Sequence, residues 1–169
     1  MKKILKFEVK YQQSGEGICG PNGIKHILLN KYGIDIAEKK LIDISNCSQK
    51  NGAAVKGILK VADTFNLNYF AKHNCSIEDL VNSIENNNPA MLLIQAWTNK
   101  KTVDWSKINY AGHYIDMVGV DTFKKKVFYY DPLDGKIKNI SYEKLDERWH
   151  DIDPRSKTFY DHFAIFFRE

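Results

Sequence analysis

The spacing of apolar residues changes halfway along the 169-residue chain, and this change limits the fold more than any other feature. In the first half, apolar residues recur at the three- and four-residue spacing of amphipathic helices. The stretches with this pattern are 20–33, 36–42, 53–65 and 76–84. Ser76, followed three residues later by Asp79, is a loose capping box for the last of them. The first half of the chain therefore predicts helices.

The second half has the pattern of strands. The run PAMLLIQAW (89–97) is continuously apolar, and HYIDMVGVD (113–121) alternates imperfectly. The run KVFYYDP (126–132) is β-branched and aromatic, and FYDHFAIFFRE (159–169) closes the chain as a further strand. Only 141–149 resembles a short helix here. The predicted fold class is α+β, with an N-terminal helical lobe packed on a C-terminal antiparallel sheet.

Length and composition indicate one globular domain over residues 1–169, with 43% apolar and 27% charged residues. The N-terminus begins like a signal peptide, but charged residues interrupt its apolar stretch and no small-residue cleavage site follows. We expect a first strand there instead, with Ile4, Phe7 and Val9. No run reaches the ~20 apolar residues of a membrane span. We therefore expect a cytoplasmic protein with no membrane span.

Charge and cysteine content argue against several other classes. The net charge is only +4 and the lysines are scattered, so we expect no nucleic-acid partner. The three cysteines, Cys19, Cys47 and Cys75, are odd in number and include no CxxC pair. This favours neither a disulfide framework nor a zinc site. We expect no metal and no cofactor.

Cys19 is the leading candidate for a reactive group. It precedes Gly20 and Pro21, and proline fits the first turn of a helix. At a helix N-terminus, unpaired N–H groups and the helix dipole stabilise a thiolate and lower the pKa of the cysteine. A structural cysteine needs no such setting. Cys47 and Cys75 are interpreted as ordinary core residues.

A nucleophilic thiolate needs a proton donor for the leaving group, and histidine serves best. Of five histidines, His26 lies two helical turns beyond Cys19, about 10 Å away and too far to pair. His73 and His150 lie in polar stretches, and His162 alternates with core aromatics. His113 begins an apolar strand after Ala111-Gly112. It is therefore the candidate base.

Asp131 is the candidate for the group that orients the imidazole. It ends the strand that follows His113, 18 residues later, so the two lie side by side if these strands pair antiparallel. Asp116 and Asp121 are alternatives. Asp116, three residues from His113, points to the opposite face of its strand, and Asp121 looks like a turn residue.

Gln13, six residues before Cys19, could donate its amide to an oxyanion beside the backbone N–H of Cys19. The neighbouring Gln12 could take the same role. Candidate substrate-binding residues are Gly20 and Gly112 beside the two reactive groups, and Trp97 and Trp105 in the loop before His113. Core packing is an equally good interpretation of the two tryptophans.

The segments QSGEGICGP, GHYIDMVGVD and YYDPLDG together resemble the papain-like cysteine peptidases that process the double-glycine leaders of bacteriocins, including their stand-alone relatives. The resemblance covers nearly the whole chain and implies a papain-like fold. It also implies Cys19 as nucleophile, His113 as base, Asp131 as orienting residue and Gln13 as oxyanion donor.

The expected activity is hydrolysis of a peptide bond in a peptide or protein substrate, through a thioester on Cys19. Two alternatives stay open. One is acyl transfer on glutamine side chains, by a transglutaminase or a deamidase, which uses the same residues. The other is a catalytically inactive module of this fold that binds a peptide.

Overall fold

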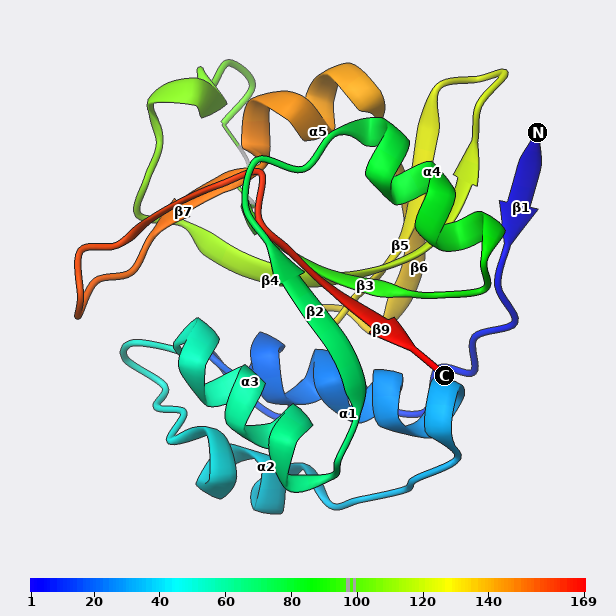
Figure 1. Ribbon diagram of the computed structural model, residues 1–169. Coiled ribbons are helices and arrows are strands. Elements are labelled where there is room, and N and C mark those ends of the chain that lie inside the picture. Colours follow the sequence, from blue (N-terminus) through cyan, green and yellow to red (C-terminus); the bar gives the residue numbers. More distant parts are fainter. Residues whose placement is uncertain (97, 99) are drawn as a thin grey trace.

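The structure, a computed structural model, describes residues 1–96, 98 and 100–169. An antiparallel sheet lies at its centre (Figure 1). In spatial order its strands are β2 (Asn68–Lys72), β9 (Ala164–Arg168), β3 (Ala90–Gln95), β4 (Gly112–Asp121), β5 (Lys126–Asp131) and β6 (Lys136–Ser141), and β1 (Lys2–Ile4) pairs with β4. A two-stranded sheet of β7 (His150–Ile152) and β8 (Phe159–Asp161) projects from one end as a hairpin.

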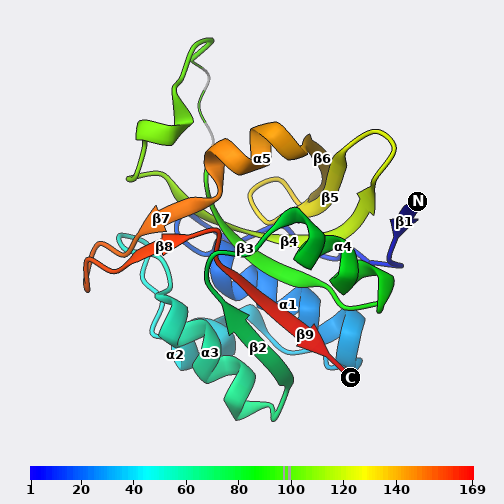
Figure 2. The same ribbon diagram turned by 45° about the horizontal axis from the view of Figure 1, so that its top comes forward.

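Helices cover both faces of the central sheet (Figures 1 and 2). The first face carries α1 (Cys19–Tyr32), α2 (Glu38–Ser45) and α3 (Val55–Thr64). The second carries α4 (Ile77–Glu85) and α5 (Tyr142–Arg148). A 3₁₀ turn, η1 (Trp105–Lys107), lies in the connection between β3 and β4.

Strand alternation sorts the core into two hydrophobic clusters. Leu93 pairs with Tyr114, and both pack toward α1–α3. Their neighbours Leu92 and Ile115 also pair, and pack toward α4 and α5. This is the period-2 alternation of a sheet that is covered on both faces. It explains why β3 is apolar from Ala90 to Ile94, and it confirms the predicted α+β fold class.

Helix α1 begins at Cys19, as the sequence indicated, with Pro21 in its first turn. Its first ten residues are all buried against the sheet and the neighbouring helices. Gly33 ends the helix with a φ of 68° and donates its N–H to the carbonyls of Leu28 and Leu29. The predicted capping box is also confirmed, because Ser76 accepts from the Asp79 N–H and Asp79 from the Ser76 N–H.

Three details differ from the sequence-based expectations. The first strand stops at Ile4, and Phe7 packs instead against the rings of His26 and Tyr130. The closing strand is divided, because His162 takes a φ of 48° between β8 and β9. Strand β2 lies within the half expected to be helical. It is a largely exposed edge strand, so its alternation is weak in the sequence.

Candidate active site

Cys19 lies at the point where α1 meets strand β4. Its side chain is at the N-terminus of the helix and only 9% of the residue is exposed. The backbone N–H of Tyr114 donates to its Sγ at 3.5 Å. Tyr114 is the neighbour of His113, so this contact holds the thiol beside the strand that carries the histidine.

His113 and Asp131 lie side by side on the paired strands β4 and β5. His113 Nε2 is 2.7 Å from Asp131 Oδ1, and the Asp131 side chain is fully buried. Asp131 Oδ1 also accepts from the Leu133 N–H at 3.0 Å. Because an ionised carboxylate only accepts hydrogen bonds, Nε2 carries the proton and donates it. The other ring nitrogen, Nδ1, is left for the thiol.

Electrostatic coupling shifts the pKa values of all three groups. Burial opposes ionisation of Cys19, but the charge and side-chain hydrogen bond of His113 outweigh it and lower the pKa of the thiol. Burial likewise opposes a charged His113, and the contacts with Cys19 and Asp131 outweigh it, so the pKa of the imidazole is raised. The pKa of Asp131 is lowered, against the effect of its burial, chiefly by His113. The three groups therefore favour a thiolate, an imidazolium and a carboxylate at neutral pH.

Lys138 is a fourth group, which the sequence did not single out. Its Nζ lies 2.9 Å from Asp131 Oδ2 and 2.6 Å from Asp134 Oδ2. Strand β6 places it there, because β5 and β6 pair across the Asp134-Gly135 turn. The turn was visible in the sequence, but the register that brings Lys138 to Asp131 was not.

The alternative acids lie elsewhere. Asp116 is fully buried on the face that α1 covers, where a Cβ on Gly23 would come within 2.8 Å of its Oδ1. Within the described residues neither of its oxygens has a hydrogen-bond partner, and burial raises its pKa well above the usual value. Asp121 accepts from the N–H groups of Phe123 and Lys124, as expected of a turn residue.

The other histidines take part in separate contacts. His26 is buried, and its ring nitrogens contact the carbonyl of Asn22 and the N–H of Lys10. His150, expected in an exposed stretch, is buried, with its Nε2 2.7 Å from the Ile108 carbonyl. His162 lies between Asp161 and Asp146.

Gln13 is buried in the segment that leads into α1. Its Nε2 donates to the Gly15 carbonyl at 2.7 Å, and its Oε1 has no hydrogen-bond partner among the described residues. Its backbone N–H donates to the Pro132 carbonyl at 2.8 Å. Gln13 is thus tied to the residue that follows Asp131.

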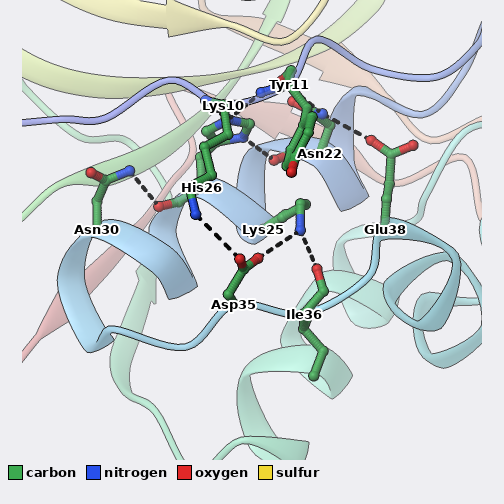
Figure 3. A network of polar contacts seen from close by, with 9 residues as sticks. All are labelled: Lys10, Tyr11, Asn22, Lys25, His26, Asn30, Asp35, Ile36 and Glu38. Carbon is green, nitrogen blue, oxygen red and sulfur yellow. Dashed lines mark hydrogen bonds and ion pairs between the residues drawn. The ribbon is translucent and has the colours of Figure 1, made fainter.

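A polar network fixes this segment against α1 (Figure 3). Asn22 Nδ2 donates to the Tyr11 carbonyl at 3.3 Å and to Glu38 at 2.8 Å. The Tyr130 hydroxyl lies 2.7 Å from Asn22 Oδ1 and 2.6 Å from the Tyr11 carbonyl. Further along the helix, Lys25 contacts Asp35 and the Ile36 carbonyl. The network links the segment of Gln13, the helix of Cys19 and the strand of Asp131.

A cavity of about 560 Å³ opens beside Cys19. Its walls come from the loop 49–55, the segment 107–114 and the β7–β8 hairpin, residues 151–160. Arg155, on the hairpin, reaches the Gly52 carbonyl across it at 3.3 Å. The cavity is large enough for a side chain of a bound peptide.

The residues predicted to bind substrate are only partly brought together. Gly112 lines the cavity with Cys19. Gly20 is buried, where an added Cβ would lie 3.0 Å from Ile58 Cδ1. Trp105 is buried under the guanidinium of Arg148, 3.9 Å from the ring centroid, and not at the cavity wall. Trp97 lies outside the described residues.

A family model described as the Peptidase_C39 like family matches residues 4–157. The chain belongs to this family. The match covers Cys19, His113 and Asp131 together, and it makes the chain a member of a papain-like cysteine peptidase family. No curated protein matches the chain.

Solved structures support the fold of this C39-like chain. A putative C39-like peptidase from Bacillus anthracis is 17% identical, with a TM-score of 0.69, and the match covers 100% of this chain and 98% of that one. A double glycine motif protease from an AMS/PCAT transporter, in complex with its leader peptide, is 13% identical (TM-score 0.64, 100% and 99% covered). The peptidase domain of Streptococcus ComA is 16% identical (TM-score 0.62, 98% and 96% covered).

Among residues 1–96, 98 and 100–169, no group of three or more His, Cys, Asp or Glu side chains is placed to hold a metal ion. Among the same residues, no helix is long and apolar enough to cross a membrane.

Proposed function

We propose that this C39-like chain is a cysteine peptidase that hydrolyses a peptide bond through a thioester on Cys19. His113 is the acid and base, Asp131 orients its ring, and Gln13 donates to the oxyanion. The proposal is carried by the two interactions of His113. It hydrogen-bonds Asp131 at 2.7 Å, and it lowers the pKa of the Cys19 thiol. One buried imidazole thus contacts both a nucleophile and a carboxylate.

The residues divide the reaction into two steps. The Cys19 thiolate attacks the peptide carbonyl carbon, and the oxygen of the tetrahedral intermediate accepts from Gln13 and the Cys19 N–H. The imidazolium of His113 gives its proton to the departing amine as the C–N bond breaks. Water then attacks the thioester while His113 takes one of its protons. The acid product leaves and the thiolate–imidazolium pair is restored.

The substrate is a peptide or protein. Support comes from the cavity beside Cys19 and from the structural neighbour that holds a leader peptide. We retain Gly112 as a substrate-binding residue because it lines this cavity. For Gly20, Trp97 and Trp105 a contact with substrate stays a prediction. So do a single domain spanning residues 1–169 and a cytoplasmic location.

Digestion of a pool of synthetic peptides tests the proposal. We expect new peptide termini, detected by mass spectrometry, in samples with the protein. Protein treated with iodoacetamide is the control and should produce none.

The other activities give different products. Ammonia release from glutamine peptides, without new termini, would identify an acyl-transfer enzyme acting on side-chain amides. Peptide retention without any product, combined with a Cys19 that thiol reagents do not label, would identify a binding module.

Lys138→Met should shift the alkaline limb of the pH profile of kcat/KM to higher pH. Lys138 is a cation beside Asp131, so it partly neutralises the carboxylate that stabilises imidazolium; its removal raises the pKa of His113. Because Lys138 is 32% exposed, we expect a shift of less than about 0.7 pH unit, from an ion pair worth ~1 kcal/mol or less.

Lys138→Arg keeps the cation and should retain the wild-type profile. Lys144→Met, which removes an exposed lysine on α5, is the matched control. An unmoved limb in Lys138→Met, with only a lower melting temperature, would give Lys138 a purely structural role.

A further inference from the structure

The cavity beside Cys19 carries a carboxylate that the proposed mechanism does not use. Asp151, the middle residue of β7, lines the cavity together with Cys19 and Gly112. A Cβ added to Gly112 would lie 2.5 Å from Asp151 Oδ2. The carboxylate therefore lies directly against the residue that precedes His113, in space that only a glycine leaves open.

A buried amide holds this carboxylate in place. Gln95, fully buried at the end of β3, donates from Nε2 to Asp151 Oδ1 at 2.8 Å and to the His150 carbonyl at 3.0 Å. Its Oε1 accepts from the Ala111 N–H at 2.8 Å. The same side chain therefore fixes both Asp151 and the segment leading to Gly112. Such support is typical of a group whose position matters.

The carboxylate of Asp151 is poorly neutralised by the described residues: the adjacent His150 acts to lower its pKa, but Asp153 acts to raise it. In the part of the chain that the structure describes, no lysine or arginine forms an ion pair with it. The neighbouring Asp153 differs, because the Arg155 guanidinium pairs with it at 3.2 Å and the backbone N–H groups of Arg155 and Ser156 also donate to it. Of the two acids that line this cavity, Asp151 is therefore the one without a lysine or arginine partner among the described residues.

Burial raises the pKa of Asp151 to about 6, although the hydrogen bond from Gln95 opposes the rise. The carboxyl is still ionised at neutral pH, but its charge is poorly solvated, and such a charge is stabilised by a cation. Lys50, Lys107 and Lys157 also line the cavity, yet all three are exposed. Solvent screens exposed charges, so they neutralise Asp151 only weakly.

We propose that Asp151 is a specificity-determining residue, which binds the cationic side chain of a lysine or arginine of the peptide substrate in this cavity. The inference rests on the proposed peptidase function and names its substrate class. A cavity of about 560 Å³ has room for a long side chain that lies along its apolar wall, with its charged end at Asp151.

Matched covalent probes test this without a known substrate. The probes are peptidyl chloromethyl ketones that are identical except at one position, which carries lysine, norleucine or glutamate. The position is varied over the three residues before the reactive ketone. The measured quantity is the rate of Cys19 alkylation, followed by mass spectrometry.

At one position we expect the lysine probe to react roughly 10- to 100-fold faster than the norleucine probe, as one charged hydrogen bond provides. Asp151→Asn should remove this preference, and Asp151→Glu, which keeps the charge, should retain at least part of it. Asp161→Asn is the matched control, since Asp161 lies on the partner strand β8 but does not line the cavity. It should keep the wild-type preference.

Labelling with iodoacetamide distinguishes a failure of the peptidase proposal from a failure of the inference about Asp151. If Cys19 reacts no faster with it than Cys47 and Cys75 do, the peptidase proposal itself fails. If Cys19 is reactive but labels equally with lysine and norleucine probes at every position, the inference about Asp151 is wrong while the peptidase proposal stands. The wild-type comparison alone decides this, even if a variant at Asp151 does not fold.

Discussion

The His113→Ala variant should lose the reactivity of Cys19 toward iodoacetamide at pH 6, by roughly 100-fold or more. In the native protein, the thiolate of Cys19 is stabilised by His113 against the effect of burial. Without the imidazole, burial remains and the cation is gone. The pKa then returns to at least the ordinary value of ~8.5, at which only about one thiol in 300 is ionised at pH 6.

The direction of the pH dependence follows from the two pKa shifts. The pKa of Cys19 is lowered and that of His113 is raised, so the ion pair exists between the two values. Labelling of the native protein should therefore stay high well below pH 8 and fall only as the pH drops through the lowered pKa of Cys19. In His113→Ala the whole curve moves to higher pH.

The other two thiols are internal controls in the same sample. Burial raises the pKa of Cys47 and of Cys75 to about 11, so both should label slowly at every pH below that value. His73→Ala, which removes a histidine that stacks on Tyr160, should leave the curve of Cys19 unchanged. A Cys19 rate that is the same with and without His113 would refute the ion pair, and with it the proposed nucleophile.

The positions of Cys19, His113 and Asp131 were predictable because each depends on a local signal. A proline after Cys19 marks a helix start, a small-residue pair before His113 marks a strand start, and the proline after Asp131 marks a strand end. Antiparallel pairing of consecutive strands then brings His113 and Asp131 together. Cys19 joins them through the packing of α1 on the sheet, which is the step that brings together distant parts of the sequence.

Lys138 and Asp151 could not be found in this way. Lys138 reaches Asp131 through the register of the β5–β6 pair, and a slip of one residue would turn it to the other face. Asp151 depends on the β7–β8 hairpin, whose three-residue strands carry too little pattern to be recognised. The sequence also gives no sign that Asp116 is buried beneath Gly23, because that contact joins two distant elements.

Gln13 lies between these two cases. Its six-residue spacing from Cys19 is visible in the sequence, but its orientation depends on contacts with three other segments. Its backbone is held by the Pro132 carbonyl, and the neighbouring Tyr11 is held by Asn22 and Tyr130. The amide nitrogen uses one hydrogen on the Gly15 carbonyl. An amide has two, so the second can still serve an oxyanion.

Gln13→Ala should therefore lower kcat by roughly 100- to 1,000-fold, the ~2.7–4 kcal/mol that one oxyanion donor contributes, with little change in KM. The oxyanion exists only in the transition state and the intermediate, so its loss does not weaken binding of the substrate. Gln13→Glu keeps the size of the side chain but removes the donor, and it should be impaired to a similar degree. The measurement is steady-state kinetics on a peptide that the wild-type protein cleaves.

Gln12→Ala is the matched control, because Gln12 is the exposed neighbour on the same segment and is the alternative donor. It should keep wild-type kcat. If Gln12→Ala were impaired and Gln13→Ala were not, the role of donor would pass to Gln12. If both variants changed KM alone, the segment would bind substrate without stabilising the oxyanion. A thioester would then form with the help of backbone N–H groups only, and the buried amide of Gln13 would serve to hold the Gly15 turn in front of α1.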